Sequence, residues 1–466
     1  MLDFSVVGSG IGGSASALFL NKLGSCRVFE KDSNLGGCSS TFMHKKAYFN
    51  TGATTFAGFE EGLVTYEFFK KHNISINSKP LDKALVVLQG SKRVDRYYEF
   101  EKFLESLESA YPHSKHRSFY SLIQDINNRF YQESGYYYQN SSFTKKLFSL
   151  LSFRNLLLSF YPYMFQSAKE FITKFYGDVD RDYLEYLENQ ILIVTQTSLD
   201  KTNFLNAALA LGYQFQKNHY IYGGLGTIFE QMEKKLDISK KDEVERIDIE
   251  QNHYLLHTKK QTVASKNIIL NTTIFDAPKL FEDREVKEYF SKYKKLDEGV
   301  SAFMLYVRLK EIGKYEHHYQ IIDEQKLPFS TSSSIFVSFG DKEDEKMNRS
   351  VTISVHVKKS TWDSEWQSKT EVLEEKILKL LKKHLGIKKD MIEFCFSARA
   401  HTFERFINRS NLGGIPLLKK NLIYKLPGND TPFKGLYQVG DSSFAAQGWA
   451  GVMMGVVNLQ RLICKS

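Results

Sequence analysis

The first thirty residues constrain the fold more than any other stretch. An apolar run, Leu2–Val7, is followed at once by a glycine-rich turn. A segment of helical character then extends to about Leu23, and a second apolar run, Cys26–Phe29, leads to Glu30. Strand, glycine turn, helix, strand and acid in this order are typical of a dinucleotide-binding unit. The sequence therefore predicts an α/β fold with a Rossmann-like domain.

The glycines of this turn each have a physical reason. Gly8 permits a tight turn, Gly10 lets the backbone approach a diphosphate, and Gly13 allows the helix to pack closely on the strand. The helix N-terminus offers unpaired N–H groups and a partial positive charge to phosphates. Glu30 is then placed to accept hydrogen bonds from ribose hydroxyls.

A second candidate binding segment lies far along the sequence. The strand-like run Gly435–Gly440 ends at Asp441, a turn follows over Ser442–Gln447, and Gly448–Cys464 has helical character. This order puts a carboxylate and a helix N-terminus in one place. Asp441 can accept hydrogen bonds from sugar-like hydroxyls, and the helix dipole can stabilise negative charge that develops on a ring.

Two further turns combine glycine with small residues. Lys31–Ser40 contains the pair Gly36-Gly37, and Ala47–Thr55 alternates into Gly52. Small residues beside such turns let the main chain lie against a flat, extended ligand. Two surface hairpin turns are the alternative interpretation.

Residues 76–219 read as mostly helical and are rich in aromatic residues and lysine. Leu147–Phe165 is the most apolar stretch, but Arg154 near its middle costs about 2.5–3.5 kcal/mol in a bilayer, and Pro162 interrupts it. We therefore reject a transmembrane helix. We favour a buried wall of a substrate pocket over a helix in the membrane interface. If the helix lay in the membrane interface, the lipid head groups would contact Lys145, Lys146, Arg154 and Lys169.

The later part of the chain predicts two sets of strands and one long helix. Runs expected to return to the nucleotide-binding sheet are Val244–Ile249, His253–His257 and Ile268–Leu270. Runs with the alternation of antiparallel strands are Gly299–Leu309, Ser333–Gly340 and Ser350–Val357. An amphipathic helix is expected between Asp363 and Leu385, with Gly386 as its stop. Its apolar face is predicted to carry Val372, Leu373, Ile377, Leu380, Leu381 and Leu385.

Charge and cysteine usage narrow the class of protein. The net charge of +9 comes from scattered Lys and Arg without a nucleic-acid-binding motif, so we expect no nucleic-acid partner. The four cysteines match no metal-ligand spacing and suit a reducing compartment, so the cytoplasm is expected. His317-His318 reads as an exposed loop pair without a third ligand, so no metal site is predicted.

Taken together, these motifs resemble the FAD-dependent amine oxidase–phytoene desaturase superfamily, and most of all its carotenoid desaturase, carotenoid isomerase and retinol saturase branch. The resemblance is carried by Gly8–Gly13, Glu30-Lys31, Gly36-Gly37, Phe49–Gly52, Gly223-Gly224-Leu225 with Val244 and Ile247, and Gly435–Gly448. It implies FAD as the cofactor. The residues implied to bind it are Gly8, Gly10, Gly12, Gly13, Glu30, Lys31, Gly37, Ser40, Gly52, Ala53, Val244, Gly440, Asp441, Gln447 and Gly448.

The resemblance also implies a domain organisation. FAD-binding segments are expected at 1–75, 220–295 and 395–466 in a fold of the GR2 flavoprotein type. A mainly helical substrate or cap region is expected at 76–219, and an α+β substrate domain, formed by a β-sheet and a helix, at 296–394.

The chain departs from the family pattern at several positions. Asn50 stands where many relatives have Asp, and Cys38 where amine oxidases commonly have a basic residue. Ala445-Ala446 replace the usual Pro-Gly, and Trp449 adds a bulky ring beside the last helix. These departures bear on the substrate and the reaction.

The implied activity is that of an FAD-dependent oxidoreductase that exchanges hydride with flavin N5 on a long apolar substrate, isoprenoid or carotenoid-like. It covers desaturation, saturation and isomerisation. An amine oxidase-type flavoprotein and a non-catalytic prenyl-binding chaperone of the same fold are the alternatives. No residue is identified as the catalytic acid or base: His401 and Glu404 lie in a segment expected near the flavin, but a lone His is more often structural. Peripheral contact with the inner membrane face is also considered, and the oligomeric state is not predicted.

Overall fold

The computed structural model describes residues 1–132, 137, 139–140, 143–152, 154–409, 411, 413–421 and 426–464. Within these residues, seven strands form a first sheet in the order β10-β2-β1-β13-β12-β11, with β19 paired to β13. Its strands are β1 (Leu2–Val7), β2 (Cys26–Glu30), β10 (Ile238–Lys240), β11 (Val244–Ile249), β12 (Tyr254–Thr258), β13 (Thr262–Leu270) and β19 (Leu436–Gln438). β1 runs parallel to β2 and to β13, as a Rossmann-like unit requires.

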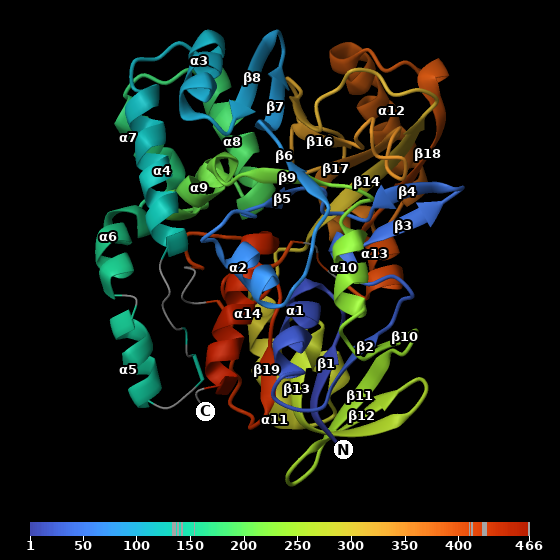
Figure 1. Ribbon diagram of the computed structural model, residues 1–466. Helices are drawn as coiled ribbons and strands as arrows, with labels where there is room; N and C mark the ends of the chain where they lie inside the picture. The colour runs from blue at the N-terminus through green and yellow to red at the C-terminus, as the bar shows by residue number, and fades with distance from the viewer. Residues whose placement is uncertain are drawn as a thin grey trace.

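Two helices from opposite parts of the sequence pack together beside this sheet. They are α1 (Ile11–Leu20) and α14 (Gly448–Cys464), and both lie near β1 and β13 in the lower half of Figure 1. Phe19 of α1 and Val456 of α14 are buried in one apolar core with Val6 and Ile269 of the sheet. This core holds the first glycine turn and the start of the last helix close to one another.

A second sheet lies in the upper half of Figure 1, and within the described residues it also has seven strands. Its order is β18-β14-β17-β16-β15-β7-β8. Its strands are β7 (Lys83–Gln89), β8 (Lys92–Tyr97), β14 (Val300–Leu309), β15 (His318–Ile322), β16 (Ser334–Phe339), β17 (Ser350–Lys358) and β18 (Ile392–Ala398). Helix α12 (Trp366–Leu385) packs on it through Leu373, Ile377 and Leu381.

The helices of the middle region pack against the β7–β8 end of this sheet and form the left side of Figure 1. They are α3 (Phe100–Ala110), α4 (His116–Gln132), α5 (Phe143–Ser152), α6 (Arg154–Met164), α7 (Ala168–Tyr176), α8 (Arg181–Thr195) and α9 (Phe204–Leu211). The remaining α-helices are α2 (Val64–Lys71), α10 (Gly226–Glu233), α11 (Arg284–Ser291) and α13 (Ala400–Ile407). The short strands are β3 (Thr41–His44), β4 (Ala47–Asn50), β5 (Phe56–Ala57), β6 (Ser78–Pro80) and β9 (Asn218–Ile221).

The structure corrects three expectations about local structure. The segment expected to be mostly helical begins with the strands β6, β7 and β8, so its helices start only at Phe100. His318 is not in an exposed loop: it is 4% exposed and begins β15, where burial lowers the pKa of its imidazole to about 4. Val372 of α12 is 46% exposed and does not share the buried face. The domain boundaries themselves remain a prediction.

The apolar stretch Leu147–Phe165 is not a buried wall. It forms α5 and α6, and most of its large side chains whose burial is described are exposed, whereas Phe160 and Met164 are buried. The exposed large apolar side chains described in the two helices and in the residue after them are Phe143, Leu147, Phe148, Leu150, Leu151, Leu158, Tyr161 and Phe165. We call these eight residues the α5–α6 apolar face. Among the described residues, no helix is long and apolar enough to cross a bilayer.

Candidate functional site

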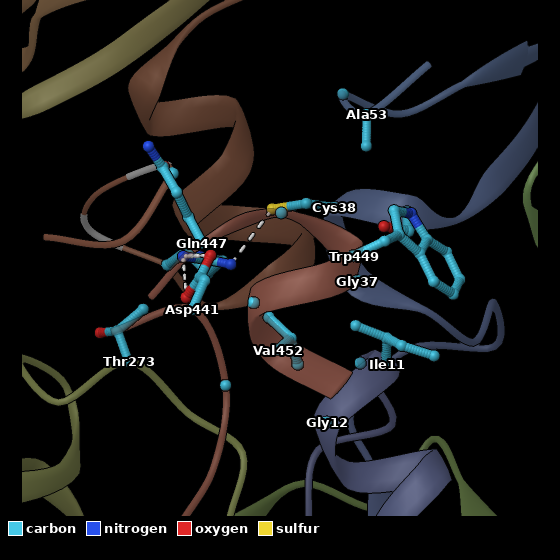
Figure 2. Close-up of a pocket in the computed structure, with 18 of the residues that line it drawn as sticks. Ile11, Gly12, Gly37, Cys38, Ala53, Thr273, Asp441, Gln447, Trp449 and Val452 are labelled. Carbon is cyan, nitrogen blue, oxygen red and sulfur yellow. Dashed lines mark hydrogen bonds and ion pairs between the residues drawn. The ribbon is translucent and has the colours of Figure 1, made fainter. Parts of the chain in front are cut away.

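A cavity of about 490 Å³ extends from the first sheet to the second. It is bordered by the glycine turn before α1, by the two glycine turns after β2 and by the segment that leads into α14. Figure 2 shows Ile11, Cys38 and Asp441, which come from these separate segments, around the same cavity. The fold therefore brings the motifs from the two ends of the sequence to one site.

The turn before α1 has the geometry that its glycines predict. Gly8 has a φ of +96°, which favours glycine. A Cβ on Gly13 would lie 2.1 Å from the carbonyl oxygen of Gly8, so this position tolerates no side chain where α1 meets its preceding turn. Gly10 and Gly12 line the cavity, and the N-terminus of α1 begins beside them. Its unpaired N–H groups and dipole are suited to an anionic group.

Glu30 lies at the end of β2 and borders the same cavity. Its carboxylate accepts hydrogen bonds from the Ser9 N–H at 2.9 Å, the Ser9 hydroxyl at 2.6 Å and the Asp32 N–H at 2.9 Å. These bonds fix the carboxylate, and Oε1, which among the described residues accepts only the Asp32 N–H, retains acceptor capacity for a ligand hydroxyl. Val244 closes this end with Lys31, whose Nζ lies 3.5 Å from a carboxylate oxygen of Glu243.

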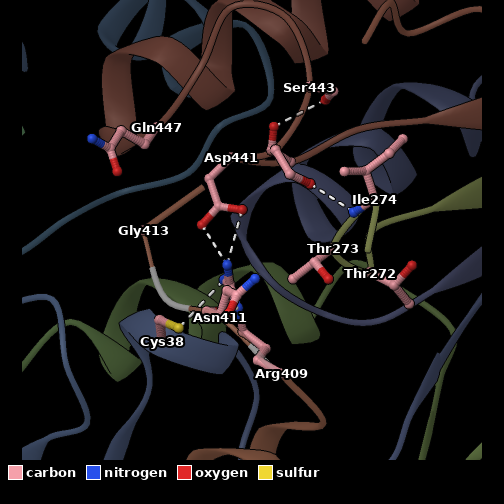
Figure 3. A network of polar contacts seen from close by, with 12 residues as sticks. Cys38, Thr272, Thr273, Ile274, Arg409, Asn411, Gly413, Asp441, Ser443 and Gln447 are labelled. Atoms are coloured by element: carbon pink, nitrogen blue, oxygen red, sulfur yellow. Dashed lines mark hydrogen bonds and ion pairs between the residues drawn. The ribbon is translucent and has the colours of Figure 1, made fainter. Parts of the chain in front are cut away.

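Asp441 lies beside the turn before α1, on the side away from Glu30. A Cβ on Gly12 would lie 3.2 Å from the backbone nitrogen of Gly440, which places α1 directly against this segment. The Asp441 carboxylate receives Nη2 of Arg409 at 3.1 and 2.8 Å. Arg409 also donates from Nη1 to the Cys38 sulfur, at 3.4 Å (Figure 3). Arg409 was not among the residues expected from the sequence.

The start of α14 borders the cavity through Gln447 and Gly448. A Cβ on Gly448 would meet no atom within 4 Å, so open space lies in front of it. Gln196, from the loop after α8, donates to the side-chain oxygen of Gln447 at 2.7 Å. The Ala53 N–H donates to the Cys38 carbonyl at 2.9 Å, which joins the second and third glycine turns.

The structure brings together most of the residues implied to bind a cofactor. Those that line the cavity are Gly8, Gly10, Gly12, Glu30, Lys31, Gly37, Gly52, Ala53, Val244, Gly440, Asp441, Gln447 and Gly448. Gly13 and Ser40 do not line it. Gly13 acts in packing, and the Ser40 hydroxyl lies 2.6 Å from that of Thr51 in a hydrogen bond.

The far end of the cavity is apolar. Its side chains come from the helical region and the second sheet: Phe130, Tyr131, Ile193, Val194, Leu209, Met304 and Phe336. The acidic residues that line the cavity in the described part of the chain all belong to segments predicted to bind the dinucleotide: Glu30, Asp32, Glu243 and Asp441. His356 of β17 also lines it, and burial lowers the pKa of its imidazole to about 4, so it is neutral at pH 7.

The cavity fits a large ligand with polar groups at one end. Four polar side-chain atoms that border it have no hydrogen-bond partner within the described residues: Thr272 Oγ1, Ser301 Oγ, Gln447 Nε2 and Trp449 Nε1. Buried polar atoms are normally paired, so four orphaned ones at one cavity indicate ligand contacts. The open space before Gly37 and Gly448 points the same way.

Residues considered for catalysis or metal binding lie elsewhere. His401 is bordered by Asp363, at 3.5 Å between Nε2 and Oδ1, and Glu404 pairs with Lys359. Neither His401 nor Glu404 lines the cavity, although Phe403 and Ile407 of the same helix do. No group of three His, Cys, Asp or Glu that could hold a metal occurs in the part of the chain that the structure describes.

Known proteins resemble this chain in sequence and in fold. Residues 6–72 match the model of an NAD(P)-binding Rossmann-like domain. Prolycopene isomerases from Daucus carota and Arabidopsis thaliana are 24% and 25% identical over 97% of this chain and over 79% and 82% of their own length.

Solved structures extend the similarity to the whole fold. An oxidoreductase from Methanosarcina mazei superposes with a TM-score of 0.66 at 16% identity, over 98% of this chain and 99% of its own. Putrescine oxidase, bound to putrescine, has a TM-score of 0.65 at 13% identity, over 100% of this chain and 98% of its own. Cyclohexylamine oxidase from Brevibacterium oxydans has a TM-score of 0.63 at 13% identity, over 99% of this chain and 97% of its own.

Fold and cavity thus define a two-domain protein of the GR2 flavoprotein type, with a Rossmann-like domain and an α+β domain that carries a helical insertion. The similarity to prolycopene isomerases in sequence and to amine oxidases in fold supports the resemblance to the amine oxidase and carotenoid desaturase superfamily. The fold class expected from the sequence motifs is confirmed.

Proposed function

We propose that this protein is an FAD-dependent oxidoreductase or isomerase that acts on a long apolar substrate, isoprenoid or polyene in character. The cavity carries the proposal, because its polar part is continuous with its apolar end. We call the polar part, bordered by the turn before α1, Glu30 and Asp441, the dinucleotide cradle. FAD would be held by the start of α1 at its diphosphate, by Glu30 at its ribose, and by Asp441, Gln447 and Gly448 nearer its ring. Bound there, the flavin would supply hydride exchange at N5.

The protein's own residues fit an uncharged substrate. Phe130, Val194 and Phe336 would pack against a hydrocarbon chain and exclude water from the ring. His356 is neutral there, so it would add no charge beside such a chain. The prolycopene isomerases among the relatives are consistent with a polyene substrate.

The amine oxidase alternative is less well supported. A cationic amine is stabilised by acidic side chains, and those that border the cavity in the described part belong to the cofactor segments. The prenyl-binding chaperone is also disfavoured, because Glu30, Asp441 and the glycines form an intact cradle. The orphaned polar atoms at the cradle likewise favour a bound cofactor.

An absorbance spectrum of the purified full-length chain tests the proposal. We expect a flavin spectrum, with FAD released on denaturation and identified by mass spectrometry. We then expect the protein, with its flavin reduced anaerobically, to convert added prolycopene to another isomer or saturation state. Chromatography measures this change. Putrescine and cyclohexylamine should neither bleach the oxidised flavin nor yield hydrogen peroxide.

Each result has a clear opposite. A colourless protein that does not take up added FAD would contradict the cofactor assignment. If either amine bleaches the flavin and prolycopene stays unchanged, the substrate is an amine and the proposal of an apolar substrate is wrong. Free reduced FAD with prolycopene is the control for chemistry that needs no protein.

We further propose that the α5–α6 apolar face contacts the cytoplasmic surface of an anionic membrane, from which an apolar substrate would enter. Phe143 is 80% exposed and Leu158 77%, and such side chains gain free energy on entering the acyl boundary. Lys145, Lys146 and Arg154 on the same helices are exposed and complement anionic head groups. In Figure 1, α5 and α6 lie at the outer left edge.

Vesicle sedimentation measures this contact. We expect the wild-type protein to bind vesicles of phosphatidylglycerol and phosphatidylcholine, and to bind pure phosphatidylcholine more weakly. The double variant Phe143→Ser/Leu158→Ser should partition at least about tenfold less, because each side chain contributes on the order of 1.5–3 kcal/mol when buried. Leu23→Ser removes an exposed apolar residue elsewhere and should bind like the wild type. Equal binding by the double variant would contradict the proposal, as would a concentration-dependent dimer that this variant abolishes.

A further inference from the structure

Arg409 places a largely buried cation beside Asp441 in the wall of the cavity. It follows α13 in the sequence and borders the cavity with Cys38 and Asp441. Its side chain is 16% exposed. Nε donates to the Asn411 carbonyl at 3.2 Å, which fixes the guanidinium plane. Figure 3 shows the group between Asp441 and Cys38.

The neighbours of Arg409 leave it able to bind an anion. Burial alone lowers the pKa of this guanidinium, but the Asp441 carboxylate raises it above the ordinary value, so the group is charged. Burial raises the pKa of the Cys38 thiol, so the sulfur is neutral. A neutral thiol is a weak acceptor, and the 3.4 Å contact from Nη1 is exchangeable for an oxygen anion.

Arg409 also lies where a diphosphate needs a cation. Gly12, at the start of α1, is next to Gly440, and the carboxylate that follows it would repel a phosphate if it were unpaired. Among the described residues, Lys31 and Arg409 are the Lys and Arg side chains that line the cavity. Lys31 stands at the Glu30 end, next to Glu243. Arg409 is therefore the cation beside the α1 turn.

Cys38 follows the second glycine turn and lines the same cavity. The Arg409 guanidinium touches the Cys38 sulfur itself, so it occupies the space into which a longer basic side chain at position 38 would extend.

We propose that Arg409 binds the diphosphate of the dinucleotide and neutralises Asp441. This rests on the proposed binding of FAD. A guanidinium suits the role because it can bond a carboxylate and a phosphate at once through separate N–H groups. Arg409 is then a cofactor-binding residue contributed by the segment between α13 and β19.

Affinity for FAD tests the assignment, measured by fluorescence quenching on the refolded or stripped full-length chain. Arg409→Gln should weaken binding by about ten- to hundredfold, the range for losing a charge-assisted hydrogen bond. Arg409→Lys should lose less. The decisive variant is Cys38→Arg/Arg409→Gln, which places a guanidinium in the same space from position 38 and should regain most of the lost affinity. Arg405→Gln, on α13 and outside the cavity, controls for net charge.

The outcomes separate this inference from the proposed function. If the wild type fails to bind FAD, the proposed cofactor is wrong. If the wild type binds and Arg409→Gln binds equally well, only the role of Arg409 is wrong. If Arg409→Gln loses affinity or fails to fold, and Cys38→Arg does not restore it, Arg409 serves the structure of the loop and the proposal is overturned.

Discussion

Gly13→Val is expected to abolish FAD binding and to destabilise the first domain. The new Cβ would lie 2.1 Å from the Gly8 carbonyl oxygen and 3.1 Å from the Asn271 Cβ. The first contact is with backbone in a tight turn, so α1 must move away from that turn. Overpacking of this kind costs about 1–3 kcal/mol and more where backbone must shift. Because the N-terminus of α1 moves with it, affinity for FAD should fall at least about hundredfold, since sites of this kind depend on placement within about 1 Å.

Calorimetry or denaturant unfolding measures the stability, and flavin fluorescence measures the affinity. Ser16→Ala on the same helix is the matched control. Its hydroxyl is buried and has no hydrogen-bond partner within the described residues, so its removal should leave both quantities nearly unchanged. Wild-type affinity in Gly13→Val would show that α1 does not present its N-terminus to the cofactor.

Arg96→Ala is expected to lower the free energy of unfolding by about 3–5 kcal/mol, because it leaves buried acceptors unpaired. Arg96 of β8 is 4% exposed. Its guanidinium donates to the side-chain oxygens of Gln190 and Gln214 and, at 2.8 Å, to the Leu211 carbonyl. No acidic side chain pairs with it among the described residues. These bonds join the second sheet to the helical region.

The effect should be confined to that junction. Hydrogen exchange should increase in α8 and α9 while α1 stays protected, and the flavin spectrum should persist at low temperature. Arg93→Ala, on the same strand, is the control: Arg93 is 50% exposed and pairs with Asp95, and such surface pairs contribute about 0–1 kcal/mol. Equal losses in the two variants would show that burial of Arg96 does not determine its contribution.

Some elements could be predicted almost to the residue and others could not. Leu2–Val7 and Val244–Ile249 form strands with the expected bounds, because each has a clear apolar pattern next to turn residues. β15 was missed because all five of its residues are buried, including His318 and Gln320. A strand buried on both faces shows no alternation.

The hairpin of β7 and β8 did carry a signal. Ala84–Leu88 is an apolar run rich in valine, and Gly90-Ser91 is a two-residue turn between the strands. The residues after β8 have helical character, so the pattern of the whole segment favours helices and the hairpin is not predicted. For α5 and α6 the apolar pattern indicates a large apolar surface, but the expected buried wall is wrong because the pattern alone does not say what covers a helix.

The sequence by itself determined the geometry of the first strand, glycine turn and helix. Gly8 and Gly13 act through local backbone geometry, and Glu30 follows at the spacing of one strand and one helix, so their positions follow from order along the chain. The tertiary structure alone decided which distant groups join them. Arg409 reaches Cys38 and Asp441 only after the two ends of the chain pack through α1 and α14, and a contact between such distant positions leaves no pattern in one sequence.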